Sequence, residues 1–347
     1  AKVCPYSAII NQKRPCEKAC KIKAISMSSE EHRAAHIDNE KCISCGACVY
    51  QCPFGAIVDK SFILDAVNFI KGSHENQDYK VYAVVAPSIS SQFSYAKLGQ
   101  VITGIQRLGF YHVIEAALGA DMVAYKEAAE LAEKGFLTSS CCPAFVSYIK
   151  KNFPTMVDKI SHNLSPAAEI GRYIKETTPG AKVVFIGPCA AKKLEASRRT
   201  IRSDVDFVLT FEEVMGMFEA KAIKFSEVAA GPELVEATAD GRGFAVSGGV
   251  ANAVVNAIHK MDPDREVKVM AAQGLQECKK MLMLAKAGKL NGYLLEGMGC
   301  PGGCVAGAGT IAPVKKSTAA VGKYVAGAKV RTIQDSAAVK RLREVQD

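Results

Sequence analysis

Short apolar runs alternate with helix-period segments over most of the chain. Runs rich in Val, Ile, Phe and Ala that predict buried strands cover 81–86, 182–186, 206–210, 267–271 and 293–295. Amphipathic or turn-bounded segments that predict helices follow at 101–108, from 211 onward and at 275–287. Such alternation is typical of parallel sheets covered by helices. We therefore predict an α/β fold for residues 79–347.

The first 72 residues follow another pattern, in which cysteines interrupt short apolar stretches. A helix is predicted over 61–73, with Phe62, Ala66 and Phe69 on one face. The polar segment 72–78 comes next and is typical of a linker. We therefore predict a small α+β domain over 1–72 and a larger domain over 79–347. A surface helix is expected near the C-terminus, at 335–345.

Composition narrows the class of protein. A length of 347 residues allows about two or three domains. No apolar run approaches the ~20 residues of a membrane helix, and the N-terminus lacks the pattern of a signal peptide. The 13 cysteines cluster at metal-ligand spacings rather than as a disulfide framework. We expect a cytoplasmic protein with iron–sulfur chemistry and no membrane insertion.

The net charge of +9 has two readings. A solvated, lysine-rich surface is the one we favour, and the alternative is electrostatic steering of an acidic electron carrier such as a ferredoxin. No basic run is interleaved with aromatic residues, so we expect no nucleic-acid binding.

One cysteine run has the spacing of a bacterial ferredoxin, Cys42-x2-Cys45-x2-Cys48-x3-Cys52-Pro. The first three cysteines wrap one 4Fe–4S cube, and in two-cluster ferredoxins the fourth ligates the neighbouring cube. The first cube therefore needs a cysteine from the earlier segment, for which Cys20 is the best candidate. The uncertain ligands of a second cube are Cys16 and Cys52, with Cys4 as a further candidate.

A short repeat, Cys-x-x-x-Ala-Ile, begins at Cys4, Cys20 and Cys52. The first copy has the form of the closing end of a motif whose beginning is absent. We therefore hypothesise that the sequence is a fragment and that the natural chain has further N-terminal cysteines.

Three loops of the larger domain contain cysteines, and each follows an apolar stretch. They are Thr138-Ser-Ser-Cys-Cys-Pro-Ala-Phe145, Phe185-Ile-Gly-Pro-Cys-Ala-Ala-Lys-Lys193 and Glu296-Gly-Met-Gly-Cys-Pro-Gly-Gly-Cys-Val-Ala-Gly-Ala-Gly309. In open α/β sheets, ligands bind beyond the carboxyl ends of strands. Glycines in the third loop allow the backbone to approach a large cofactor closely. The alternative is a tight turn with two core cysteines.

These three loops, in this order and behind a ferredoxin motif, resemble the active-site domain of FeFe-hydrogenases from about residue 79 to 313. The resemblance implies two lobes with an H-cluster between them, which is a 4Fe–4S cube linked to a two-iron unit. That unit has CO, cyanide and a bridging azadithiolate. The implied cube ligands are Cys142, Cys189, Cys300 and Cys304, the last also bridging to the two-iron unit.

The same resemblance implies a proton relay. Cys141 matches the first proton acceptor, Glu127 and Glu130 match two relay glutamates, and Ser161 matches the relay serine. The i, i+3 spacing of the glutamates places both on one helical face. The alternatives are a solvated helix face for the glutamates and a structural role for Cys141.

Other residues match contacts to the two-iron unit. Lys192 and the Pro87–Ser88 pair match hydrogen-bond donors to cyanide, and Met298 matches a methionine packed nearby. A surface ion pair is the alternative for Lys192, and simple core packing is the alternative for Met298. Relatives often have methionine where this chain has Gly187, so we expect a roomier pocket here.

The resemblance implies an oxygen-sensitive enzyme of anaerobic metabolism that interconverts H2 with protons and electrons, with ferredoxin or a similar carrier as partner. Separate maturation proteins would install the two-iron unit. Two alternatives are an H2-sensing relative of low activity and an iron–sulfur scaffold or assembly protein without the two-iron unit. Cys141, Glu127 and Glu130 argue against the first, and Lys192 with Pro87–Ser88 argues against the second.

Overall fold

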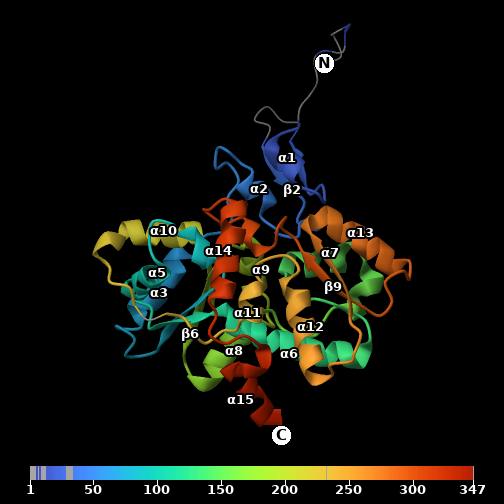
Figure 1. The fold of residues 1–347 in the computed structure, drawn as a ribbon. Helices are drawn as coiled ribbons and strands as arrows, with labels where there is room; N and C mark the ends of the chain where they lie inside the picture. Colours follow the sequence, from blue (N-terminus) through green and yellow to red (C-terminus); the bar gives the residue numbers. More distant parts are fainter. Residues whose placement is uncertain (1–4, 7, 9–12, 29–33, 232, 347) are drawn as a thin grey trace.

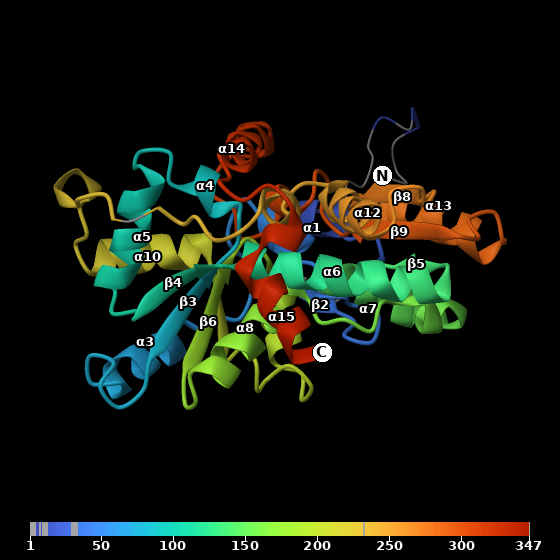
Figure 2. The same cartoon turned by 60° about the horizontal axis from the view of Figure 1, so that its bottom comes forward.

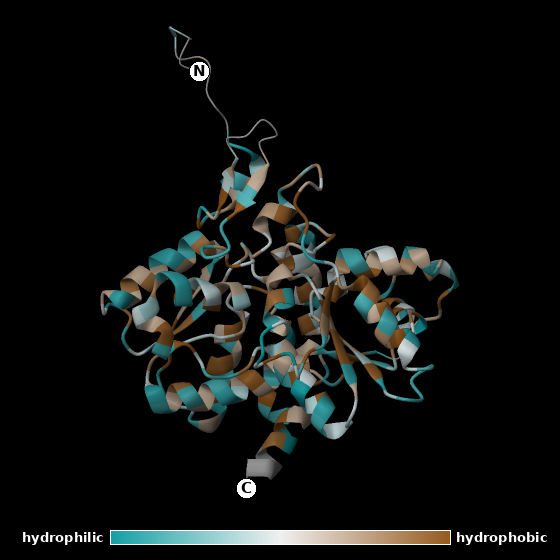
Figure 3. Ribbon diagram, turned by 180° about the vertical axis from the view of Figure 1, so that it is seen from behind, coloured by the Kyte–Doolittle hydropathy of each residue, from teal (hydrophilic) through white to brown (hydrophobic). Residues whose placement is uncertain are grey.

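The computed structural model describes residues 5–6, 8, 13–28, 34–231 and 233–346. Two lobes lie side by side, and a small N-terminal unit sits on top of them (Figure 1). Hydrophobic residues concentrate along the strands of both lobes (Figure 3). Each lobe contains a parallel sheet with helices around it, which confirms the predicted α/β architecture.

The first lobe is built on a four-stranded parallel sheet of order β4-β3-β6-β7. Its strands are β3 (Val81–Val85), β4 (His112–Glu115), β6 (Lys182–Gly187) and β7 (Phe207–Thr210). Helices α5 (Leu98–Arg107) and α10 (Phe211–Ala220) lie on one face, and α8 (Pro166–Thr177) lies on the other (Figure 2). Val183, Val184 and Ile186 are fully buried, as a strand covered on both faces requires.

The second lobe is built on a three-stranded parallel sheet of order β5-β9-β8. Its strands are β5 (Leu137–Thr138), β8 (Lys268–Gln273) and β9 (Tyr293–Met298), and its helices are α7 (Pro143–Asn152), α12 (Gly249–Met261) and α13 (Gly274–Lys286). Leu294 and Leu295 of the central strand are fully buried.

The long helix α6 (Ala116–Lys134) connects the lobes, because it follows β4 of the first sheet and leads into β5 of the second. It packs against α8 on one side and α12 on the other. Its 19 residues span roughly 28 Å, enough to run along both lobes.

Shorter elements complete the structure. The N-terminal unit contains α1 (Pro15–Ala19), α2 (Ala47–Tyr50) and the antiparallel pair β1 (Ile25–Met27) and β2 (Ala35–Ile37). The others are α3 (Ile63–Gly72), α4 (Ile89–Gln92), α9 (Ala190–Ala196), α11 (Ala239–Gly243), α14 (Val314–Ala326) and α15 (Ala337–Gln346). Among the described helices, none combines the length and the apolar character needed to cross a bilayer.

Helix α3 precedes the domain boundary that the sequence predicts at 72–78, but it packs against the first lobe. The ring of Phe207 in β7 packs against Phe62 and Phe69, at 5.5 and 4.9 Å between ring centroids. Ala66 is fully buried in the core of the first lobe. We therefore propose that α3 belongs to the larger domain and that the boundary precedes it.

The central strand β9 provides a test of the second lobe's core. We expect Leu295→Ala to lower the free energy of unfolding by about 2–5 kcal/mol, because it leaves a cavity under a fully buried side chain. Val269→Ala in the adjacent strand β8 is the matched control, since Val269 is 39% exposed. Urea unfolding followed by circular dichroism measures both, and equal losses would contradict the assigned burial.

Candidate metal centre

Parallel strands of both sheets deliver the sequence-predicted loops to one region. The cysteine loops follow β5, β6 and β9, and the Pro87–Ser88 segment follows β3. Because all these strands are parallel within their sheets, their carboxyl ends lie on the same edge of each sheet.

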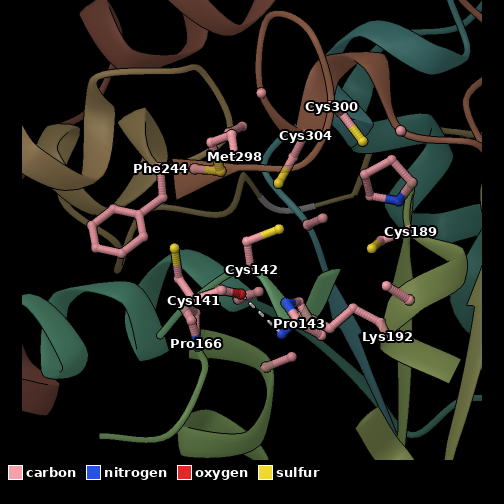
Figure 4. A pocket seen from close by; sticks show the side chains of 18 of the residues that line it. Cys141, Cys142, Pro143, Pro166, Cys189, Lys192, Phe244, Met298, Cys300 and Cys304 are labelled. Atoms are coloured by element: carbon pink, nitrogen blue, oxygen red, sulfur yellow. Dashed lines mark hydrogen bonds between the residues drawn. The ribbon is translucent and has the colours of Figure 1, made fainter. Parts of the chain in front are cut away.

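The four cysteines predicted as cube ligands line a single cavity. Figure 4 shows the sulfur atoms of Cys142, Cys189, Cys300 and Cys304 arranged around a common space. Burial and the charge of Cys142 raise the pKa of Cys189 to about 11, while burial and the neighbouring cysteines raise the pKa of Cys300 well above its usual value. Thiols held in this way are stable as thiolates only beside a positive charge, which is what a metal centre supplies.

The spacing of these thiols fits a cluster better than a single ion. In the described part of the chain, no three His, Cys, Asp or Glu residues could hold one metal ion. A tetrahedral ion with bonds of ~2.3 Å would bring its sulfurs to within about 4 Å of one another. A 4Fe–4S cube binds each thiolate to a different iron, so its ligands stand farther apart.

Two of these cysteines stand at helix N-termini. Cys142 and Cys189 are the N-cap residues of α7 and α9, where backbone N–H groups point outward. The N–H of Gly299 lies 3.4 Å from the Cys142 sulfur and donates to it. Amides that donate to ligand sulfurs in this way tune the reduction potential of an iron–sulfur cluster.

Two glycines of the third loop are required by close contacts. Gly303 has φ of 93°, and a Cβ there would lie 2.7 Å from the backbone nitrogen of Ser247. A Cβ at Gly307 would lie 2.3 Å from the carbonyl oxygen of Pro188 in the second loop. Side chains at either position would push the third loop away from its neighbours.

Lys192 lines the same cavity and is buried, so a surface ion pair is the wrong reading of this residue. Its Nζ donates to Oε2 of Glu195 at 2.6 Å and to the carbonyl oxygen of Cys141 at 3.4 Å. Burial lowers the pKa of Lys192, but Glu195 and the nearby thiols outweigh it and raise the pKa overall. The site therefore holds a buried ammonium group.

Ser88 supplies an orphaned polar atom. Its side chain is fully buried, and its Oγ has no hydrogen-bond partner among the described residues. Pro87 lines the cavity, and so does Met298 on the opposite lobe. A buried hydroxyl without a partner is costly, so it indicates an acceptor supplied by a bound group.

An aromatic ring lies beside Gly187, where the sequence predicts a roomier pocket. A Cβ at Gly187 would lie 2.5 Å from the ring of Phe185, two residues earlier on the same face of β6. Phe185 is buried and lines the cavity. The aromatic ring thus fills the space that a side chain at Gly187 would need.

The predicted relay residues lie in one connected group. Oε1 of Glu127 accepts from the N–H and the hydroxyl of Ser140 at 3.2 and 3.3 Å, while its Oε2 has no partner among the described residues. Burial raises the pKa of Glu127 to about 7, and the hydroxyl of Ser161 acts in the opposite direction. Burial and the charge of Glu127 raise the pKa of Cys141 well above its usual value.

Ser161 and Glu130 continue this group toward the surface. The Ser161 hydroxyl donates to Oε2 of Glu130 at 2.9 Å. Lys134 donates to Oε1 of Glu130 at 2.6 Å, beside the exposed side chain of His162. Partial burial opposes ionisation of Glu130, but Lys134 and the His162 amide prevail and lower its pKa.

The ferredoxin-like cysteines form a second group. Cys20, Cys42, Cys45 and Cys48 line one cavity in the N-terminal unit, as the ligand swap predicts. Burial and the three neighbouring cysteines raise the pKa of Cys45 to about 11, although an amide opposes the shift. Cys45 also lines the cavity of the four lobe cysteines, so the two groups are adjacent.

The candidate ligands of a second cube, Cys16 and Cys52, do not line the cavity of Cys20, Cys42, Cys45 and Cys48. The third candidate, Cys4, lies outside the described residues. The Cys52 sulfur accepts from the Ala56 N–H at 3.2 Å, and backbone amides lower the pKa of Cys52. Among the described residues, no cavity gathers Cys52 with a set of co-ligands.

Sequence reasoning missed two residues of the cavity environment. Glu195 pairs with Lys192, and their i, i+3 spacing on a helix was a usable signal. Phe244 forms part of the apolar wall beside Cys141 (Figure 4), and no local pattern marks it.

Comparisons with known proteins agree with this geometry. Residues 79–308 match the family described as iron only hydrogenase large subunit, C-terminal domain, and residues 35–58 match the 4Fe-4S binding domain. The fold is similar to that of an apo FeFe-hydrogenase HydA1 variant from Chlamydomonas reinhardtii. That comparison has a TM-score of 0.68 and 22% identity, covering 82% of this chain and 94% of that one.

Curated relatives fall into two groups. The NADP-reducing hydrogenase subunit HndD of Solidesulfovibrio fructosivorans is 26% identical over 77% of this chain, which spans only 55% of that protein. The periplasmic Fe hydrogenase large subunit of Nitratidesulfovibrio vulgaris is 29% identical, covering 79% of this chain and 85% of the relative. The cytosolic Fe-S cluster assembly factor NAR1 of Eremothecium gossypii is 24% identical, covering 78% and 65%.

The two cysteine groups predict separate losses of iron. We expect Cys300→Ala to lose the iron of the cube between the lobes and Cys45→Ala to lose the iron of the N-terminal cube, because each removes one ligand of four. Cys278→Ala is the control, since Cys278 is fully buried and lines neither cavity. Iron and sulfide analysis of reconstituted protein measures the losses, and full iron in Cys300→Ala would contradict the assignment.

Proposed function

Because this chain belongs to the iron only hydrogenase large subunit, C-terminal domain family, we propose that it catalyses the reversible interconversion of H2 with protons and electrons. The observation that supports this best is the buried group of Cys141, Glu127, Ser161 and Glu130, which leads from the cavity to the surface. A protein that only stores or transfers a cube needs no path for protons.

The residues of the cavity fit an H-cluster. Cys142, Cys189, Cys300 and Cys304 would hold its cube, and the ammonium of Lys192 and the unpartnered hydroxyl of Ser88, next to Pro87 of the cavity wall, would supply hydrogen-bond donors to it. When bound, the group supplies a Lewis-acidic metal and an adjacent base for splitting H2.

The chain's own residues then move the proton. In the direction of H2 oxidation, Cys141 receives it and Glu127 accepts it from Cys141. A carboxyl with a pKa near 7 suits this role, because it can both accept and donate near neutral pH. The Ser161 hydroxyl passes the proton to Glu130, which is ionised and close to solvent.

Electrons would leave through the N-terminal unit. Cys45 lies beside the cavity of the lobe cysteines, so a cube on Cys20, Cys42, Cys45 and Cys48 would stand next to the buried one. We propose ferredoxin or a similar carrier as the external partner, maturation proteins as the source of the two-iron unit, and the reducing cytoplasm as the location.

The similarity to NAR1 favours a second candidate, an iron–sulfur assembly factor that holds cubes without a two-iron unit. Infrared spectroscopy after maturation with a two-iron precursor separates the two. Hydrogenase function predicts CO and cyanide bands together with H2-dependent dye reduction. Loaded cubes without those bands would favour the assembly factor.

Glu127 provides a direct test of the relay. We expect Glu127→Gln to lower turnover by about 10²-fold or more, because an amide cannot accept the proton. Glu133→Gln, on the exposed face of the same helix, is the control and should keep wild-type turnover. Iron content and infrared bands should be unchanged in both variants, and wild-type activity in Glu127→Gln would refute the relay.

The raised pKa of Glu127 also predicts the pH profile. Below pH 7 its carboxyl is neutral and cannot accept a proton, and above pH 7 it is a carboxylate. H2 oxidation should therefore rise as pH increases through about 7, while proton reduction should fall over the same range. Initial rates in both directions measure this, and an unchanged inflection in Glu127→Gln would assign it to another group.

A further inference from the structure

We propose that Lys193 is a positioning residue for electron transfer, which holds the N-terminal cluster unit against the buried cube. This inference rests on the proposed function, because it assumes that electrons pass between the two cysteine groups. Lys193 follows Lys192 in α9, but it does not line the cavity of the lobe cysteines.

The ammonium of Lys193 is buried between the N-terminal segment and the first lobe. Its Nζ lies 2.7 Å from Oδ2 of Asp59 and 2.8 Å from Oε2 of Glu213. It also donates to the carbonyl oxygen of Lys60 at 2.9 Å. The ammonium therefore has two carboxylates as ion-pair partners and one carbonyl oxygen as a hydrogen-bond acceptor, and the Lys193 side chain is only 6% exposed.

The partners lie on opposite sides of the junction. Asp59 and Lys60 follow the cysteine run 42–52 directly, whereas Glu213 belongs to α10 of the first lobe. Glu213 is itself held by the N-cap of that helix, where its Oε2 accepts from the Thr210 N–H at 2.7 Å. Lys193 therefore connects the Asp59 carboxylate, on the segment after the cysteine run, to the Glu213 carboxylate of the first lobe.

Removing the Lys193 ammonium would leave the carboxylates around it unpaired. Asp59 and Glu213 would remain as carboxylates around the same point, with Glu212 close to both. Their repulsion, in a site largely removed from water, would drive the segment away from the lobe.

Two further contacts hold the same unit, and both come from elements next to a lobe cysteine. Lys151 of α7 donates to the carbonyl oxygens of Cys42 and Asn39 at 2.7 and 3.0 Å. Gly46 sits so close that a Cβ would lie 2.5 Å from Ala308 and 2.9 Å from Ala190. Lys151 is exposed, so Lys193 is the buried ionic contact of the three.

These contacts determine how close the two cubes lie. Cys45 lies between Cys42 and Gly46 and contributes to the raised pKa of Cys300. A shift of the segment would change this separation directly, and electron transfer falls steeply with distance. Positioning of this kind can change rates greatly for a displacement of about 1 Å.

The test compares Lys193→Met, Lys193→Arg and Lys175→Met in the full chain with reconstituted clusters. Lys175 is the matched control, because its Nζ lies 2.7 Å from Oδ2 of Asp206 within the first lobe and its side chain is 22% exposed. The readouts are iron content, magnetic coupling between the two reduced cubes in electron paramagnetic resonance spectra, and the rate of reduction of an external ferredoxin by H2.

We expect Lys193→Met to keep its iron, to lose most of the magnetic coupling and to slow ferredoxin reduction about tenfold or more. Lys193→Arg should restore both, and Lys175→Met should change neither. Unchanged coupling in Lys193→Met, or equal effects in Lys175→Met, would overturn the proposal. Asp59→Asn should give a smaller loss of coupling, because it removes the ion pair to the segment without leaving unpaired carboxylates, and it replaces Lys193→Met if that variant fails to take up iron.

The coupling is measured after chemical reduction with dithionite and needs no turnover. If the wild type shows coupled cubes but no H2 activity, the proposed function fails and the positioning role is still tested by the variants. If the wild type is active but its cubes are uncoupled, the positioning role fails and the function stands.

Discussion

The gathering of four thiols around one cavity is the constraint on which the site depends. Burial is the main cause that raises the pKa of Cys189 and of Cys300, and neighbouring thiols add to the shift. A protein gains nothing from this arrangement unless a positively charged metal centre converts the thiols to bound thiolates. The fold is therefore best understood as a container for an iron–sulfur group, with its loops shaped by that group.

Two separate parallel sheets make this container possible. Strand ends from one sheet present Pro87–Ser88 and Cys189, while strand ends from the other present Cys142, Cys300 and Cys304. Backbone hydrogen bonds of the sheets hold these ends rigidly, so the intervening loops can be irregular and rich in glycine. The same arrangement leaves the cavity where the strand ends of the two lobes meet.

Buried polar groups join the elements around the cavity. Arg242 of α11 donates to both carboxylate oxygens of Glu115 at 2.8 and 3.0 Å, and the hydroxyl of Tyr324 also bonds to that carboxylate. Glu296 of β9 accepts from the N–H groups of Gly248 and Ala251 at 2.7 and 2.8 Å, at the start of α12. Each buried carboxylate accepts at least two hydrogen bonds, which offset the cost of removing its charge from water. The same bonds connect α11, α12 and α14 to the strands that carry the carboxylates.

The sequence by itself determined the features that depend on local spacing. The cysteine intervals from Cys42 to Cys52 predict a cube, and the alternation of apolar and helical segments predicts parallel sheets, because both are set within a few residues. Only the tertiary structure decided which distant groups meet. Phe185 filling the space at Gly187, α3 packing on the first lobe, and Lys193 joining Asp59 to Glu213 all depend on how remote segments pack, and no local pattern encodes that.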